Sequence, residues 1–284
     1  MKIMSPSADQ TSPSTLSADA IKEGLRTRWI GQPAIYYFDV VESTNTEANR
    51  LAQDGAPEGT LIVAGAQTKG RGRLGRTWVS PPVSGLYLSI ILRPVHPPDW
   101  FPRLMLTAGV AVASAIQQIG TTPQLKWPND ILIGDRKVCG ILTETVFNKT
   151  RIDFAVLGIG INVNTEQDEL PISIRNLATS LRLGLGKRVS RIDLLQILLY
   201  QLEQWYESLD TGAFPTILET WSEFDTTLGR VVEIFLPERR VIGVAEALHQ
   251  DGTLLVRDKR DCLHRIVAGD VVHCHLDPSS DLKS

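Results

Sequence analysis

Several features are scarce in this sequence, and each scarcity excludes a class of protein. The chain of 284 residues contains three cysteines, which are too few for a disulfide framework and suit a reducing compartment. No apolar run approaches the roughly 18 residues of a membrane span, and no hydrophobic signal core follows Lys2. The formal net charge is −3, whereas a nucleic-acid-binding domain is usually strongly basic. We therefore expect a cytoplasmic protein that binds neither membranes nor DNA.

The composition is that of an ordinary globular protein, and the length suffices for one large domain and a small one. Residues 1 to about 15 are rich in Ser, Thr and Pro and almost lack apolar side chains, so we expect a disordered tail. Helical spacing behind Ser17 predicts one short helix within residues 17–28. A helix-turn-helix domain needs several helices, so residues 1–28 are too short to form one.

Strand and helix patterns from Trp29 onward predict an α+β domain in which helices pack on a mixed sheet. The expected strands are 35–41, 61–66, 86–92, 131–133, 137–145 and 154–163, and the expected helices are 44–53, 104–119 and 191–209. The helix at 44–53 begins with the capping-box pattern Thr44-Asn45-Thr46-Glu47. We assign residues 29–222 to this domain.

The pattern changes to short strands and turns near residue 224, which is typical of a small β-barrel. The expected strands are 231–236, 240–248, 253–256 and 263–275, with a hairpin turn at 250–252. We assign residues 223–284 to this barrel. Cysteines and histidines gather in it: Cys262, His264, His273, Cys274 and His275. Because they lack C-x-x-C spacing, we interpret them as barrel-wall residues and not as a metal site.

The stretch KGRGRLGRTW at residues 69–78 combines glycine with positive charge. Its glycines form the G-x-G-x-x-G pattern of dinucleotide-binding proteins, which requires a strand before the glycines and a helix after them. The strand is expected at 61–66, but Pro81 and Pro82 forbid the helix. We therefore reject a dinucleotide site and predict a flexible loop that clamps a phosphate or carboxylate.

Three further stretches contain charged residues, proline or glycine that a hydrophobic core does not need. They are QLKWPNDI at 124–131, DRKVCGILTE at 135–144 and LGIGINVN at 157–164. In the last stretch Gly158 and Gly160 lie two apart in a strand, so both open the same face, as happens where a ligand comes close. Asn162 follows on that face. Each stretch alone is a weak signal, but together with the arginines they predict an anion site.

Five motifs together resemble the biotin protein ligases: ESTNTEA at 42–48, GRGRLGRTW at 70–78, KWPNDI at 126–131, KVCGIL at 137–142 and GIGINV at 158–163. Their order and spacing match those of the family, and the resemblance covers the chain from about Trp29 to the C-terminus. It implies a biotin/lipoate ligase type of catalytic domain followed by an SH3-like barrel.

The resemblance also implies a reaction. Such enzymes activate the carboxylate of biotin with ATP and Mg²⁺, which yields biotinyl-5'-AMP, and then pass biotin to a lysine of a biotin carboxyl carrier protein. The carrier belongs to a biotin-dependent carboxylase such as acetyl-CoA carboxylase. The residues suit this chemistry because a carboxylate that attacks a phosphate brings two anions together, and fixed cations lower that barrier.

The resemblance and the side-chain chemistry give one set of candidate site residues. The catalytic candidates are Arg71, Arg73, Lys126, Asp130 and Lys137. The biotin-binding candidates are Ser43, Thr44, Asn45, Gln67, Gly70, Arg71, Arg73, Lys137 and Gly140. The ATP-binding candidates are Arg73, Arg76, Trp78, Lys126, Asn129 and Asn162.

Some roles stay open on the sequence alone. Thr44 is either a biotin ligand or a helix cap, and Trp78 either covers the adenylate or fills the core. Asp130 fixes Lys126, helps to place Mg²⁺ or accepts the proton of the incoming lysine. We expect the arginine loop to be disordered without ligand and to close over the adenylate.

The alternative functions are a lipoate or octanoate ligase and a biotin-binding module without turnover. The residues decide neither the oligomeric state, with a homodimer left open, nor the role of the N-terminal tail.

Overall fold

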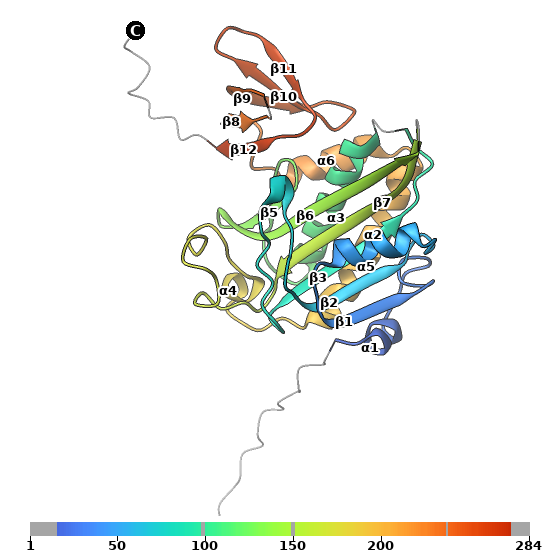
Figure 1. The fold of residues 1–284 in the computed structure, drawn as a ribbon. Helices are drawn as coiled ribbons and strands as arrows, with labels where there is room; N and C mark the ends of the chain where they lie inside the picture. Colours follow the sequence, from blue (N-terminus) through green and yellow to red (C-terminus); the bar gives the residue numbers. More distant parts are fainter. Residues whose placement is uncertain (1–15, 98–99, 149–150, 237, 274–284) are drawn as a thin grey trace, which may run out of the picture.

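Two β-sheets organise the chain (Figure 1). The structure is a computed structural model, and it describes residues 16–97, 100–148, 151–236 and 238–273. The larger sheet has seven strands in the order β1-β2-β3-β7-β6-β5-β4. These are β1 (Ile35–Val41), β2 (Leu61–Gln67), β3 (Gly85–Leu92), β4 (Gln124–Lys126), β5 (Asp130–Ile133), β6 (Arg136–Asn148) and β7 (Arg151–Asn162). Among the described strands of this sheet, β1 and β2 pair in parallel and the other neighbours pair antiparallel, so the predicted mixed sheet is confirmed.

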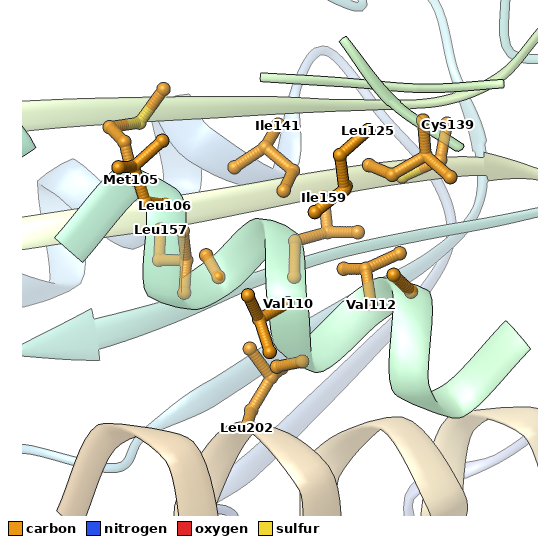
Figure 2. Close-up of a cluster of buried hydrophobic side chains, with 14 of the residues drawn as sticks. Met105, Leu106, Val110, Val112, Leu125, Cys139, Ile141, Leu157, Ile159 and Leu202 are labelled. Carbon is orange, nitrogen blue, oxygen red and sulfur yellow. The ribbon is translucent and has the colours of Figure 1, made fainter. Parts of the chain in front are cut away.

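One face of the large sheet buries the main hydrophobic core against three helices, which are α3 (Phe101–Gln118), α5 (Arg191–Asp210) and α6 (Phe214–Phe224). Figure 2 shows Val110 and Val112 of α3 between the strands, which carry Leu157 and Ile159, and Leu202 of α5. Helix α3 is apolar on nearly every side, as expected for a helix enclosed between a sheet and a second helical layer.

The opposite face carries a smaller core beneath α2 (Thr44–Gln53), in which Ala48 and Leu51 pack with Ile62 and Phe154. Side chains alternate between the faces of a strand, so residues 85, 87 and 89 of β3 point toward α2 while their neighbours point into the main core. Helix α2 contacts β2, β3 and β7 on this face.

The second sheet is antiparallel, with five strands in the order β11-β10-β9-β8-β12. They are β8 (Val231–Phe235), β9 (Arg240–Leu248), β10 (Leu254–Asp258), β11 (Leu263–Ile266) and β12 (Asp270–His273). The predicted hairpin turn at 250–252 is confirmed, with Gly252 at φ +85°. The sheet lies at one end of the large one, next to α6 (Figure 1), and is consistent with the predicted SH3-like barrel.

The sequence prediction missed three short or proline-marked elements and merged two others. Strand β4 has three residues, α4 (Leu181–Leu185) has five, and α6 carries proline in its first turn. Proline is favourable there because the first helical N–H groups have no partner within the helix. The prediction of one strand over 263–275 is wrong, because β11 ends at Ile266. A separate strand, β12, follows and pairs with β8. Among the described residues, no helix is long and apolar enough to cross a bilayer.

The buried carboxylate of Glu203 ties the start of the large domain to α5. Its side chain is 1% exposed and accepts the backbone N–H groups of Arg28, Trp29 and Ile30 at 2.7, 2.9 and 3.1 Å. Helix α1 (Ala18–Glu23) precedes the anchored residues 28–30. Its predicted cap is confirmed, because the Ser17 hydroxyl accepts the N–H of Ala20.

We expect Glu203→Ala to lower the free energy of unfolding by about 3 kcal/mol, because one buried and two partly buried N–H groups lose their acceptor. Urea unfolding measures the change. Glu207→Ala is the matched control, since it removes a partly exposed partner of Arg28 and should cost less than about 1 kcal/mol. Equal effects of the two substitutions would contradict this account of the anchor.

Candidate active site

A floor without side chains lies on the α2 face of the large sheet. Gly140 of β6 stands opposite Gly160 of β7, and Gly158 stands between Leu142 of β6 and Ser89 of β3. Residues opposite each other in neighbouring strands share a face, so the predicted common face of Gly158 and Gly160 is confirmed. A Cβ at each of these glycines would crowd a neighbouring side chain, Asn45 at Gly158 and Trp78 at Gly140 and Gly160.

The start of α2 stands over one end of this floor. Ser43, Thr44 and Asn45 are each less than 5% exposed. The Thr44 N–H donates to Gln67 Oε1 at 2.8 Å, and Gln67 Nε2 donates to Ser80 Oγ at 2.9 Å. The prediction that Thr44 begins a capping box is wrong, because Ser43 occupies the N-cap position and makes no side-chain cap bond. The orphan N–H of the first turn is satisfied instead by a side chain 23 residues away.

Asn45 is fixed from three sides. Its Oδ1 accepts the Ser89 hydroxyl at 2.7 Å, and its Nδ2 donates to Glu144 Oε2 at 2.8 Å and to the Leu142 carbonyl at 3.3 Å. A Cβ on Gly158 would lie 2.0 Å from Asn45 Oδ1. Asn45 can therefore occupy this position only when residue 158 is glycine.

The arginine loop forms a small hairpin of its own. Arg71 and Thr77 form an antiparallel bridge, and the Trp78 N–H donates to the Gly70 carbonyl at 2.9 Å. Leu74 lies at its exposed tip with φ 54°. Residues 73–75 form only a single 3-10 turn, and β3 follows the tandem prolines. The rejection of a dinucleotide-binding helix is thus confirmed.

The arginines of the loop point to different neighbours. Arg71 Nη2 lies 3.0 Å from Glu144 Oε2, and Arg73 Nη1 donates to Asn129 Oδ1 at 3.0 Å. Asn129 is itself held, because its Nδ2 donates to the Ile141 carbonyl at 2.7 Å. Arg76 is exposed. The loop therefore touches both β6 and the turn before β5.

Trp78 lies on the glycine floor. A Cβ on Gly160 would come within 2.5 Å of Trp78 Nε1, and one on Gly140 within 3.1 Å of Trp78 Cζ3. Lys137 Nζ lies 5.6 Å from the centre of the indole ring, within the range of a cation–π contact. The buried Nε1 has no hydrogen-bond partner, so the indole has an unused donor on the floor.

Lys137 and Asp130 form a close ion pair at the edge of the floor. Lys137 Nζ lies 2.5 Å from Asp130 Oδ1, and the two side chains are 33% and 28% exposed. Lys126 ends β4 directly opposite Asp130 in the β4–β5 ladder and is half-buried. The sequence left three roles open for Asp130. The structure adds a contact that was not predicted, the ion pair with Lys137.

Asn162 is buried, like the candidates at the start of α2. It is 5% exposed, and its Nδ2 donates to the Thr179 carbonyl at 3.0 Å. Cys139 of the KVCGIL motif points into the main core (Figure 2), where burial raises the pKa of its thiol far above the ordinary value. The thiol therefore stays protonated and is unsuited to nucleophilic chemistry.

Two polar residues of this face were missed from the sequence, Ser89 and Glu144. Ser89 is fully buried in an otherwise apolar strand, and that interruption is the signal that marks it. Glu144 lies four residues after Gly140 in β6, so strand alternation puts it on the glycine face. The candidates thus form four groups: Thr44 with Gln67, Asn45 and Arg71 around Glu144, Trp78 with Lys137 and Asp130, and Arg73 with Asn129.

No metal cluster forms among His, Cys, Asp and Glu side chains in the part of the chain that is described. His264 Nε2 lies 2.8 Å from Asp258 Oδ2, and this hydrogen bond lowers the pKa of the Asp258 carboxyl. Cys274 and His275 lie outside the described residues. The interpretation of His264 as a barrel residue agrees with its place in β11.

The fold and the site define a class of protein, in which cationic side chains lie around a glycine floor, an arrangement suited to an anionic ligand such as a carboxylate or a phosphate. The sequence profile of the biotin/lipoate A/B protein ligase family matches residues 37–162, and the chain belongs to this family. The predicted resemblance to biotin protein ligases is confirmed.

Three relatives illustrate the similarity. The bifunctional ligase/repressor BirA of Bacillus subtilis is 37% identical over 260 residues, which cover 91% of this chain and 79% of that protein. The biotin–(acetyl-CoA-carboxylase) ligase of Mycobacterium tuberculosis is 34% identical over 268 residues, with 89% and 95% covered. The structure of the biotin protein ligase from Aquifex aeolicus in complex with biotin and ATP matches with a TM-score of 0.71 and 32% identity, over 84% of this chain and 97% of that one.

Proposed function

We propose that this protein is a biotin protein ligase. A carboxylate oxygen of biotin attacks the α-phosphorus of ATP, so that a C–O–P anhydride forms and pyrophosphate leaves. The amine of a carrier lysine then attacks the biotinyl carbonyl, an amide forms, AMP leaves, and the lysine proton passes to a base. The observation that carries the proposal is that Asn45, Trp78 and Lys137 lie against the glycines of one sheet face, while Glu144 holds Arg71 and Asn129 holds Arg73 beside it.

In this proposal the start of α2 binds the ureido ring of biotin. Ser43, Thr44, Asn45 and Gln67 offer donors and acceptors in a buried setting, where a polar ligand group pairs strongly and an apolar one leaves them unsatisfied. This polarity favours biotin over lipoate and octanoate, whose hydrocarbon and dithiolane groups make few hydrogen bonds.

The cations take the anionic end of the complex. Arg71, Arg73 and Lys137 hold the biotin carboxylate and the α-phosphate, with Gly70 and Gly140 allowing close approach, and Lys126 and Arg76 reach the remaining phosphates. Trp78 lies against the adenylate, and Asn129 and Asn162 contact the nucleotide. Because all of these cations are present, catalysis is a better account than a binding module without turnover.

Mg²⁺ enters the proposal through ATP. The described part of the chain holds no three-carboxylate cage, but Asp130 supplies one carboxylate beside Lys126 and Lys137. One carboxylate together with phosphate oxygens and water is the donor set that Mg²⁺ prefers. The ion would neutralise charge on the phosphates, and Asp130 would orient the lysines.

The remaining assignments follow from the same proposal. Residues 29–222 form the catalytic domain, and the barrel from residue 223 assists with ATP and with the carrier domain of a biotin-dependent carboxylase. The enzyme acts in the cytoplasm. Contacts between the two parts, such as the Trp127 N–H donating to Thr227 Oγ1 at 3.0 Å, provide the physical link.

Transfer to the carrier tests the proposal. The protein is incubated with biotin, ATP, Mg²⁺ and a biotin carboxyl carrier domain, and the carrier mass is measured. One biotinyl group should appear on the carrier and none on a carrier whose target lysine is replaced by arginine. An unchanged carrier mass would argue against a ligase.

We also expect biotin and ATP together to slow tryptic cleavage at Arg71–Arg76 at least about fivefold, because ordering of a loop over the adenylate shields it from protease. Peptide mass mapping over time measures the rate. Cleavage at exposed Arg239, which lies in the barrel, is the internal control. Protection that is absent, or equal at both places, would contradict loop closure.

A further inference from the structure

Glu144 lies where two parts of the proposed site meet. Its Oε2 accepts Asn45 Nδ2 at 2.8 Å and Arg71 Nη2 at 3.0 Å. Asn45 comes from the start of α2 and Arg71 from the arginine loop, while Glu144 belongs to β6. A single carboxylate oxygen therefore joins the proposed ring-binding residue to a proposed anion-binding residue.

The contact orients Arg71 more than it stabilises the fold. The side chains of Arg71 and Glu144 are 44% and 29% exposed, and a pair so open to solvent adds little to stability. A guanidinium group, however, carries five N–H donors in a fixed plane. Holding one corner of that plane at Nη2 sets the direction of the others and reduces the entropy that a ligand must overcome.

Charge makes the arrangement conditional on Arg71. A carboxylate beside the site would repel an acidic ligand, and the neighbouring guanidinium cancels that repulsion. Loss of Arg71 therefore removes a cation and also exposes the negative charge of Glu144. This double consequence separates an electrostatic positioning role from simple packing.

We infer that Glu144 is a positioning residue for biotin, because its Oε2 fixes Arg71 and Asn45 relative to each other while Arg71 screens its charge. The inference rests on the proposed function and adds to it a residue outside the candidate set. Glu144 itself touches neither the reacting carboxylate nor the phosphate.

The test is a double-mutant cycle read as the KM for biotin in biotin-dependent ATP–pyrophosphate exchange. Glu144→Gln should raise this KM about fivefold with kcat nearly unchanged, and Arg71→Ala should raise it about thirtyfold. In the Arg71→Ala background, Glu144→Gln should instead lower the KM about threefold, because it removes an unopposed negative charge. Glu47→Gln is the control, since Glu47 pairs with Arg50 on the outer surface of α2.

Glu144→Asp provides a second variant, because it keeps the charge but retracts the oxygen by one methylene. It should raise the KM in the otherwise native protein and give no rescue of Arg71→Ala. Additive effects in the cycle, or an unchanged KM for both Glu144 variants while the native protein is active, would overturn the inference alone. A native protein without biotin-dependent exchange would overturn the proposed function and the inference with it.

Discussion

Lys137→Met should lower kcat for biotin-dependent ATP–pyrophosphate exchange by about 10³-fold, the upper end of what one electrostatic donor contributes to a transition state. Lys137 Nζ lies 2.5 Å from Asp130 Oδ1 and 5.6 Å from the centre of the Trp78 ring. In the proposed reaction this ammonium group meets the carboxylate and the α-phosphate as they approach. Methionine keeps much of the aliphatic stem and removes only the charge.

The paired substitution distinguishes chemistry from folding. Lys137→Met leaves Asp130 without this cation, so Lys137→Met combined with Asp130→Asn should recover any lost thermal stability while kcat stays low. Steady-state exchange and thermal unfolding are measured for both variants. A kcat within threefold of the native value, or recovery of kcat in the double variant, would contradict a direct role for the ammonium group.

Gly158→Ala should raise the KM for biotin by about 10²-fold, which corresponds to the loss of one or two well-placed hydrogen bonds in a buried site. The new Cβ would lie 2.0 Å from Asn45 Oδ1, so the Asn45 side chain must leave its place. Its bonds to Ser89 and Glu144 would break as a result. Isothermal titration with biotin measures the same loss without turnover.

Two other glycines give matched controls for Gly158→Ala. Gly109→Ala in α3 meets only ordinary contacts, with Leu125 Cδ2 at 3.5 Å, and should leave both substrates unaffected. Gly160→Ala would crowd Trp78 Nε1 at 2.5 Å and should raise the KM for ATP more than that for biotin. If Gly158→Ala and Gly160→Ala changed the KM for biotin equally, the assignment of Gly158 to the biotin site and of Gly160 to the ATP site would be contradicted.

Much of the fold was predictable because its signals are local. Strand β1 and helix α2 begin and end at the predicted residues, and β9 also has its predicted bounds. Each combines a regular apolar pattern with turn-forming residues nearby, which short-range physical rules describe well. The position of β12 depends on pairing with the distant strand β8, which no local pattern records, and β4 has only three residues, too few for a recognisable pattern.

The sequence predicted most of the residues that form the site but not which of them contact one another. Glycine spacing placed Gly158 and Gly160 on one face, and the motifs pointed to Arg71, Arg73 and Lys137. The partner of Thr44 is Gln67, and the partner of Arg71 is Glu144, 73 residues away. Such pairs arise only after the sheet assembles, so the sequence left Thr44 open between a biotin ligand and a helix cap and gave Glu144 no role.

The most direct test of the central claim is ATP–pyrophosphate exchange by the purified protein without any carrier, with biotin, lipoate and octanoate in parallel reactions. Exchange requires adenylate formation and its reversal, and therefore reports the acid that is activated. We predict exchange with biotin and none above background with the other two acids. Exchange with lipoate or octanoate, or no exchange with any of the three, would contradict the assignment as a biotin protein ligase.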